Sequence, residues 1–191
     1  MSKQPKRTPQ RRIVTLGPET LSGSGDQLAD SRKLGMKRST TVTRTTIIRA
    51  AAERCFEFIS RQLEETPQWD PMIMWVNPIM KKHIRVGSMS RVNFSLDGVV
   101  EEAVAMIRSY KPNKSLLWTS NHSSQLQEQW YLEEEPHGTL VTVTLGYNTS
   151  GWLFGRLADK IFMKGKVERA VNEMLESLRI TVESSQQSQI Q

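Results

Sequence analysis

Hydrophobic and polar residues change their spacing along the chain, and each change predicts a different element. Residues 40–48 are dense in β-branched side chains, which is typical of a strand. Residues 50–60 place apolar side chains at helical spacing, and a second short helix is predicted over residues 62–66, closed by Pro67 and Pro71. The chain is therefore predicted to open with one strand followed by two short helices.

From residue 73 onward apolar positions recur at every second residue, which is the period of half-buried strands. Asp97-Gly98 is a hairpin signal between two of these strands. The last strand alternates cleanly, with Val141, Val143 and Leu145 on one side. The predicted strands span residues 74–79, 88–96, 99–110, 115–121, 125–134 and 139–148. Together with the first strand they predict one antiparallel sheet of seven strands.

A helical pattern of apolar residues runs from about Trp152 to about Glu183. These residues recur at three- and four-residue steps, so they form one stripe that can face a sheet. Gly165 lies inside the pattern and predicts a kink or a junction between two helices. Because this helix is the one long partner for the apolar face of the sheet, we expect the sheet to curve around it and to leave a cavity. The predicted fold class is α+β.

The net charge of +6 belongs to the N-terminal part of the chain. Residues 1–40 hold nine basic and three acidic side chains, whereas residues 41–191 hold 17 of each sign. Because the remainder is neutral, no nucleic-acid partner is expected. Residues 1–38 and 184–191 are polar and lack apolar periodicity, so we predict a disordered tail at each end of a domain at 39–183. The basic tail is either a phosphate-seeking or membrane-surface arm or, as we prefer, a solubilising or processed leader.

The cysteine and histidine residues narrow the chemistry. Cys55 is the one cysteine, and it lies on the apolar stripe of the first helix, where a thiol acts as a small hydrophobe. His83, His122 and His137 have no carboxylate or cysteine at ligand spacing, so no metal or cofactor is expected. No segment approaches the roughly 20 apolar residues of a membrane-spanning helix. With no apolar N-terminal segment either, we expect a soluble cytoplasmic protein.

Several short segments resemble a known family. The run Thr46–Ile59, followed by Gln68-Trp69-Asp70-Pro71, is similar to the opening of the polyketide cyclase/dehydrase-like branch of the START and Bet v 1-like (SRPBCC) superfamily, although Ala51 stands where that family often has proline. The segments Val86-Gly87-Ser88, Tyr110-Lys111-Pro112, Leu116-Leu117-Trp118 and His137-Gly138-Thr139 fit the same template over about residues 39–183. The resemblance implies a helix-grip fold, in which a seven-stranded sheet wraps around the C-terminal helix. It also implies a hydrophobic pocket for a lipid, polyketide, sterol, quinone or aromatic compound.

A ligand pocket needs apolar walls with a few placed polar groups. Five tryptophans and nine methionines favour an adaptable cavity lining, although a single aromatic residue more often belongs to a core. The candidate wall residues are Trp69, Met74, Trp75, Phe94, Met106, Trp118, Trp130, Tyr147, Trp152, Phe154, Leu157 and Ile161.

Three charged residues share strand faces with apolar residues. Glu128 is in register with Trp130, and Glu102 and Arg108 are in register with Met106. If these faces point inward, the three side chains could orient the polar end of a ligand or take part in proton transfer. The alternative is that they form solvated cross-strand ion pairs on the outside of the sheet.

Three functions remain open. The first is a non-enzymatic carrier or sensor of a small hydrophobic molecule. The second is a cyclase or dehydratase in which Glu128 or Glu102 moves protons, and a buried carboxylate with a raised pKa would favour it. The third assigns the apolar and basic stretch Trp152–Lys164 to a membrane surface or a protein partner, although we prefer to place this stretch over the pocket mouth. The sequence contains no pattern for nucleophilic catalysis and no phosphate-binding glycine motif.

Overall fold

The computed structural model describes residues 39–187, except 80–83, 97, 122–124 and 149–159. Its elements are β1 (Ser39–Ile48), α2 (Ala52–Arg61), β2 (Ile73–Pro78), β3 (Met89–Leu96), β4 (Val99–Lys111), β5 (Ser115–Ser120), β6 (Gln127–Glu135), β7 (Gly138–Asn148) and α3 (Lys160–Gln187). The seven predicted strands are confirmed, because β-branched density and two-residue alternation mark them in the sequence.

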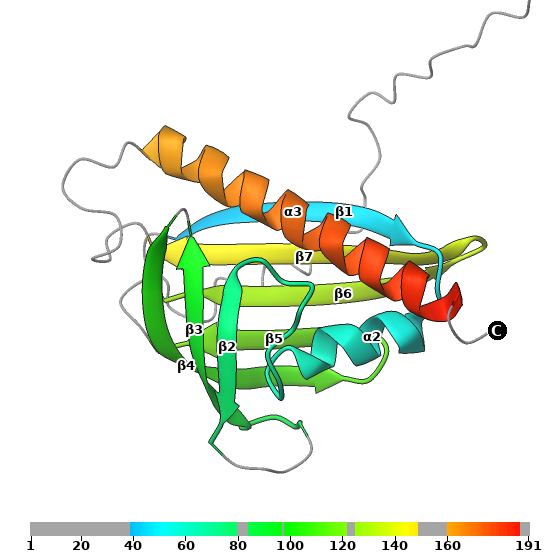
Figure 1. Ribbon diagram of the computed structural model, residues 1–191, viewed down its shortest axis with the longest axis horizontal. Coiled ribbons are helices and arrows are strands. Elements are labelled where there is room, and N and C mark those ends of the chain that lie inside the picture. Colours follow the sequence, from blue (N-terminus) through cyan, green and yellow to red (C-terminus); the bar gives the residue numbers. More distant parts are fainter. Residues whose placement is uncertain (1–38, 80–83, 97, 122–124, 149–159, 188–191) are drawn as a thin grey trace, which may run out of the picture. The chain divides into compact units, whose positions relative to one another are not determined.

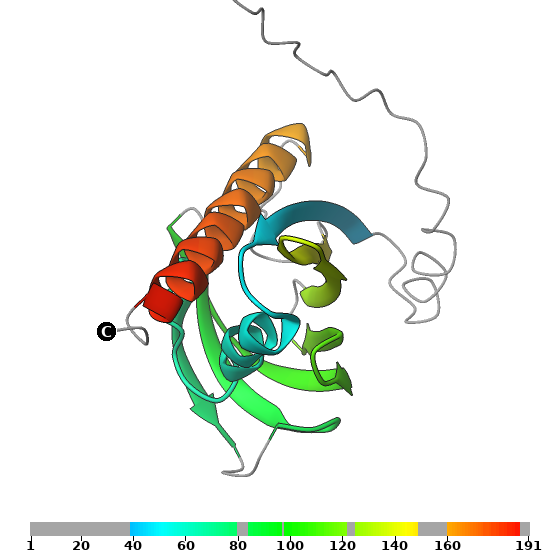
Figure 2. The same cartoon turned by 90° about the vertical axis from the view of Figure 1, so that its right-hand side faces the viewer.

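The strands form one antiparallel sheet in the order β1-β7-β6-β5-β4-β3-β2 (Figure 1). Strands that follow each other from β2 to β7 are neighbours, and β1 joins the sheet by pairing with β7. Figure 2 shows the sheet curving, with α2 and α3 on its inner side. The arrangement is the helix-grip fold: a curved sheet with a long C-terminal helix lying along its concave side.

The apolar stripe of α3 faces the sheet, as the three- and four-residue spacing predicts. Its buried residues are Val167, Val171, Met174, Leu175, Leu178 and Val182. The helix is continuous from Lys160 to Gln187, so the prediction of a junction between two helices at Gly165 is wrong. It also extends past Glu183, where the sequence pattern predicts its end.

The second short helix predicted at Gln62–Thr66 is not confirmed. Residues 62–65 form turns, in which the backbone N–H groups of Glu64 and Glu65 both donate to the carbonyl oxygen of Arg61. The chain then runs through Pro67 to β2 without further helix. As a result the segment between α2 and β2 follows the interior closely, and it buries the side chains of Gln62 and Trp69.

Polar contacts join the first strand to the closing helix. Arg44 donates from Nε to Oδ1 of Asn172 at 3.1 Å, and its guanidinium lies 3.2 Å from a carboxylate oxygen of Glu168. The backbone N–H after β1, on Arg49, donates to Oε1 of Glu183 at 3.0 Å. These contacts fix both halves of α3 to the edge of the sheet and so hold the helix over the interior.

The turn into β7 needs a glycine. A Cβ atom on Gly138 would lie 2.2 Å from the carbonyl oxygen of Ile48, a distance that no side chain tolerates. Next to it, Oγ1 of Thr139 donates to the carbonyl oxygen of Ala50 at 2.7 Å. The end of β1 and the start of α2 are thereby held against the β6–β7 turn.

Candidate functional site

A small cavity lies between the sheet and the N-terminal part of α3. Its volume is about 40 Å³, which is room for a few water molecules. Pockets for drug-sized ligands measure roughly 300–1,000 Å³. The residues that line the cavity are Asp70, Met72, Ile73, Val92, Phe94, Ser95, Leu96, Trp118, Leu126, Glu128, Leu145, Tyr147 and Val167. They come from β3, β5, β6, β7 and α3 and from the segments that lead into β2 and β6.

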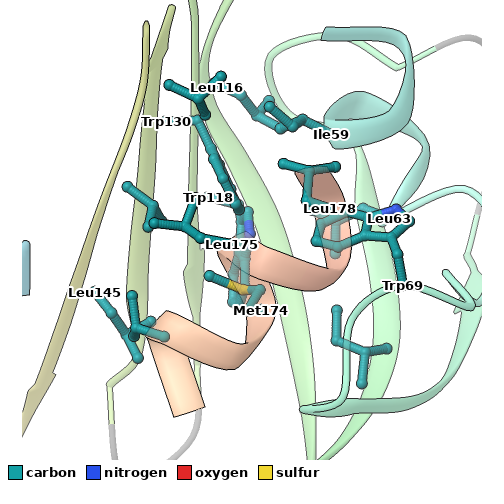
Figure 3. Close-up of a cluster of buried hydrophobic side chains, with 14 of the residues drawn as sticks. Ile59, Leu63, Trp69, Leu116, Trp118, Trp130, Leu145, Met174, Leu175 and Leu178 are labelled. Carbon is teal, nitrogen blue, oxygen red and sulfur yellow. The ribbon is translucent and has the colours of Figure 1, made fainter. Parts of the chain in front are cut away.

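Large side chains fill the rest of the space under α3. Figure 3 shows Trp118 and Trp130 between the strands and the helix. Trp69 approaches the same cluster from the α2 side, and its ring meets that of Trp130 edge-on with 6.2 Å between the centroids. Aromatic side chains that the sequence predicts as cavity walls thus occupy most of the hollow. The cavity that remains is much smaller than the sequence pattern led us to expect.

Glu128 is the best-held carboxyl group of the interior. It lies on the inner face of β6 and is 2% exposed. Its Oε1 accepts hydrogen bonds from Nε2 of Gln62 at 2.6 Å, from Nε1 of Trp118 at 3.1 Å and from Nε1 of Trp130 at 2.5 Å. Burial raises the pKa of Glu128 above its usual value, and the three N–H donors oppose that rise.

Asp70 is a second buried carboxyl group at the cavity wall, with 4% of its surface exposed. Its Oδ1 accepts a hydrogen bond from the backbone N–H of Met72 at 2.8 Å. Its Oδ2 is buried and meets no hydrogen-bond donor or acceptor among the described residues. Burial, and after it the charge of Glu128, raise the pKa of Asp70 to about 8. Near neutral pH this side chain is therefore a carboxylic acid.

The arrangement places an ionisable pair at an otherwise apolar cavity. Glu128 offers a carboxylate held by three donors, and Asp70 offers a proton at the pH of most cells. Such a pair can accept and donate hydrogen bonds to one ligand, and it can take and return a proton. Oε1 of Gln62 is also buried and meets no partner among the described residues, so it adds a further acceptor beside Glu128.

Asp70 and Gln62 were not among the predicted site residues. Gln62 falls in the stretch predicted as an exposed second helix, and Asp70 stands between tryptophan and proline, where an aspartate usually bonds to the backbone two residues on. That local bond does occur, to Met72. The sequence signal for Asp70 is its place directly after a buried Trp69 and close to a strand, which points to an interior position only once the turn is known to lie inside.

The structure separates the predicted wall residues into three groups. Phe94, Trp118 and Tyr147 line the cavity. Trp69 and Trp130 are buried beside it in the core. Met74 is exposed, and Trp75 and Met106 are half-buried and do not line the cavity.

Among the predicted charged residues, Glu128 faces the interior and Glu102 and Arg108 do not. Both are exposed on β4, and Arg108 donates from Nε to Oγ1 of Thr119 at 2.9 Å. The inward face of β4 carries the small residues Ala103 and Ala105 instead. Because alanine gives a weak hydrophobic signal, the larger side chains of the outer face are mistaken for the buried set.

Other predictions fall outside the residues that the structure describes. Trp152, Phe154 and Leu157 lie within 149–159, and the side chain of Ile161 is not described either. The suggested membrane or partner contact of residues 152–164 rests on the same stretch and stays a prediction.

Cys55 is buried and unpaired, as predicted for a small hydrophobe. Burial raises the pKa of its thiol to about 11, so the reactive thiolate is scarce at neutral pH. Among the described residues, no three His, Cys, Asp or Glu side chains gather in an arrangement that could hold a metal ion. No helix in that part of the chain is both long and apolar enough to cross a membrane.

Solved structures with the same fold support this architecture. A protein from Thermus thermophilus has a TM-score of 0.63 and 17% identity, over 76% of this chain and 99% of that one. An aromatase/cyclase from Streptomyces sp. R1128 has a TM-score of 0.62 and 15% identity, over 76% and 94% of the two chains. A START superfamily protein from Mycobacterium smegmatis has a TM-score of 0.61 and 17% identity, over 75% and 97%. At these identities the likeness concerns the fold alone.

No curated protein matches this chain in sequence. A family model described as "Polyketide cyclase / dehydrase and lipid transport" matches residues 39–183. That range contains every strand and most of α3, and therefore the cavity and both of its carboxyl groups. The chain belongs to the polyketide cyclase/dehydrase and lipid transport family, within the START and Bet v 1-like superfamily.

Proposed function

We propose that this protein is a carrier or sensor that binds one small, mostly apolar ligand in the cavity under the N-terminal part of α3. The observation that carries the proposal is the pairing of Asp70 and Glu128 at the wall of a cavity whose other lining residues are almost all apolar. Burying two carboxyl groups costs stability that an all-apolar wall would not cost. Their position is therefore better explained by a ligand with a polar group than by packing.

The size of the cavity limits the ligand or requires the wall to move. A volume of about 40 Å³ does not admit a large lipid as it stands. Met72, Leu96 and Leu126 line the cavity but are only half-buried, so their side chains have room to shift towards solvent. Methionine in particular adapts to ligands of different shape because its side chain is unbranched and flexible. We expect the ligand to enter by displacing this part of the wall.

Native mass spectrometry of the full chain, purified from its own host, tests the proposal. We expect a fraction of the protein to carry one apolar compound that is lost on denaturation. A Val167→Phe variant should lose the compound, because Val167 lines the cavity and a larger ring would occupy it. Val171→Phe, the matched change one turn further along α3 and outside the cavity lining, should retain it. Recovery of folded protein from the host with no bound compound at all would contradict the proposal.

The second candidate is a cyclase or dehydratase, and the raised pKa values of Asp70 and Glu128 favour it. In a dehydration, a base takes the proton from a carbon next to a carbonyl, a C=C bond forms as the C–O bond breaks, and an acid gives its proton to the departing hydroxyl, so that water leaves. Glu128 as base and Asp70 as acid fit these roles. Incubating the recovered compound with fresh protein distinguishes the candidates, because a carrier returns it unchanged and an enzyme returns it with the mass of one water removed.

A further inference from the structure

The two carboxyl groups at the cavity differ in how well a negative charge is stabilised on them. Three side-chain N–H donors, from Gln62, Trp118 and Trp130, converge on Oε1 of Glu128. Asp70 is served only by backbone N–H groups of the residues that follow it, chiefly Met72 on Oδ1. Each donor favours the charged form of its carboxyl group, and two charges this close disfavour each other. The single negative charge of the pair therefore belongs on Glu128, and the proton belongs on Asp70.

The position of that proton follows from the contacts of Asp70. Oδ1 already accepts the hydrogen bond from the backbone N–H of Met72. Oδ2 has no partner among the described residues, although it is fully buried. A proton on Oδ2 makes an O–H donor that lacks an acceptor, and a buried donor without an acceptor costs about 1–3 kcal/mol. Because Asp70 belongs to the wall of the cavity, an acceptor on a bound molecule can remove this cost.

We propose that Asp70 donates a hydrogen bond from Oδ2 to a neutral oxygen acceptor of the ligand, such as a ketone, aldehyde or ester carbonyl, while the charged Glu128 excludes anionic ligands. This inference rests on the proposed function and names the polar group that the ligand carries. An apolar molecule without an acceptor leaves Asp70 unsatisfied. A carboxylate ligand would meet the charge of Glu128 in an apolar surrounding, where like charges repel most strongly.

A ligand with an ammonium group is the opposite case. It could pair with Glu128, but Oε1 of that residue already receives three N–H groups, and an ammonium group would lose its own hydration in the apolar cavity. The proton of Asp70 would also point at a donor rather than an acceptor. The geometry thus favours a neutral carbonyl over both ions.

Few other ionisable groups face the site. The titratable groups that line the cavity with Asp70 are Glu128 on β6 and Tyr147 on β7. Burial and the charge of Glu168 raise the pKa of Tyr147 from a value already above neutral, so its hydroxyl stays protonated. The cavity residues of β3, β5 and α3 are uncharged, and among them are Phe94, Trp118 and Val167. The proton on Asp70 therefore depends on Glu128 and on burial.

Four probes of the same size test this on the full chain: ethylbenzene, acetophenone, benzylamine and benzoate. Binding is followed by NMR through the indole N–H signals of Trp118 and Trp130, which both contact Glu128. We expect acetophenone to bind about 2- to 12-fold more tightly than ethylbenzene at pH 6.5, which corresponds to one net hydrogen bond. Benzylamine and benzoate should bind more weakly than ethylbenzene. The preference for acetophenone should vanish as the pH rises through about 8, where Asp70 loses its proton.

Two isosteric variants separate the roles of the carboxyl groups. Asp70→Asn keeps the acceptor for Met72 and places an N–H donor where Oδ2 stood, so it should keep the preference for acetophenone above pH 8. Glu128→Gln removes the charge and should bring benzoate binding to the level of ethylbenzene or above. Glu102→Gln makes the same chemical change at an exposed site and is the control.

The outcomes distinguish this inference from the proposed function. Equal binding of acetophenone and ethylbenzene by the wild type, or a preference for benzylamine or benzoate, would overturn the inference while a ligand-binding cavity remains. An acetophenone preference that persists unchanged above pH 9 in the wild type would overturn it as well. If none of the four probes binds, both the proposed function and the inference that rests on it fail.

Discussion

The interior under α3 has two ends that differ in kind. The filled end, formed by Trp130, Leu116, Met174 and Leu178, is packed without exposed surface, and Figure 3 shows these side chains meeting between the strands, α2 and α3. The cavity end, formed around Val167 of α3, keeps a space of about 40 Å³ and two buried carboxyl groups. One helix serves both ends, so the difference comes from the side chains and not from the backbone.

This difference separates stability from function. The filled end has the composition expected of a core, where apolar side chains are close-packed. The cavity end combines a void with Asp70 and Glu128, and each of these features lowers stability. Proteins tolerate such features chiefly at functional sites. The cavity end is therefore the part of the interior that packing alone does not explain.

The pH dependence of stability gives the largest expected effect, and it belongs to the cavity end. The pKa of Asp70 in the folded protein, about 8, lies above its unfolded value near 3.8, so the folded state binds the proton more tightly. The stability that this proton contributes is complete below pH 3.8 and is lost as the pH rises to about 8. The free energy of unfolding should fall over that range by up to about 1.4 kcal/mol per pH unit.

Urea denaturation at a series of pH values measures this slope. Asp70→Asn should flatten it, since an amide does not titrate, and Glu102→Gln at the exposed face is the control. The same slope in Asp70→Asn and in the wild type would show that Asp70 is not the group that titrates.

Removing a side chain from the filled end is the next largest change. Leu178→Ala should lower the free energy of unfolding by about 2–5 kcal/mol, because Leu178 is fully buried and the packed surroundings cannot close the resulting space. Ile180 lies on the same helix but is 55% exposed, so Ile180→Ala should change stability by less than about 0.5 kcal/mol. Chemical denaturation of both variants makes the test, and similar costs would mean that this end is not tightly packed.

Enlarging a side chain should affect the two ends in opposite order. Val171→Phe overfills a packed position and should cost about 1–3 kcal/mol. Val167→Phe, one turn closer to the start of α3, can direct its ring into the cavity and should cost less. Thermal denaturation of the pair measures the difference. A larger loss for Val167→Phe than for Val171→Phe would contradict the assignment of free space to the cavity end.

The smallest expected effect concerns the hydrogen bonds that join the two ends at Glu128. Trp118→Phe removes one of three N–H donors to Oε1 and should cost about 1 kcal/mol, since two donors remain. It should also raise the pKa of Glu128 further. Trp75→Phe removes the same atoms from a half-buried position outside the cavity and is the matched control. Carboxyl chemical shifts followed against pH report the pKa, and an unchanged value would mean that the indole does not stabilise the charge.

Glutamates at two strand positions show how far the sequence could predict the site. Glu128 alternates with Trp130 on a face whose large apolar residues are buried, so the two-residue period places it correctly. Glu102 alternates with Val104 and Met106, which look equally apolar but lie on the outer face. The period of a strand defines two faces without saying which one is inside. On β4 the inner face is lined with alanine, so hydrophobicity favoured the wrong one.

The filled hollow shows the same limit for size. Five tryptophans in the sequence indicate bulky interior residues, but the pattern does not say whether their rings surround a space or occupy it. That depends on the rotamer of each ring and on the distance between helix and sheet. Trp69 and Trp130 turned out to meet edge-on and to fill it.

By itself the sequence determined the order of the strands, the apolar stripe of the closing helix and, through many weakly similar positions, the family. These properties follow from local periodicity and backbone preference, which neighbouring residues carry along the chain. Only the tertiary structure brought Gln62 and Asp70 to Glu128 and left the space beside them. Contacts between distant segments depend on the curvature of the sheet and on the turn after α2, and neither is written in the spacing of any single segment.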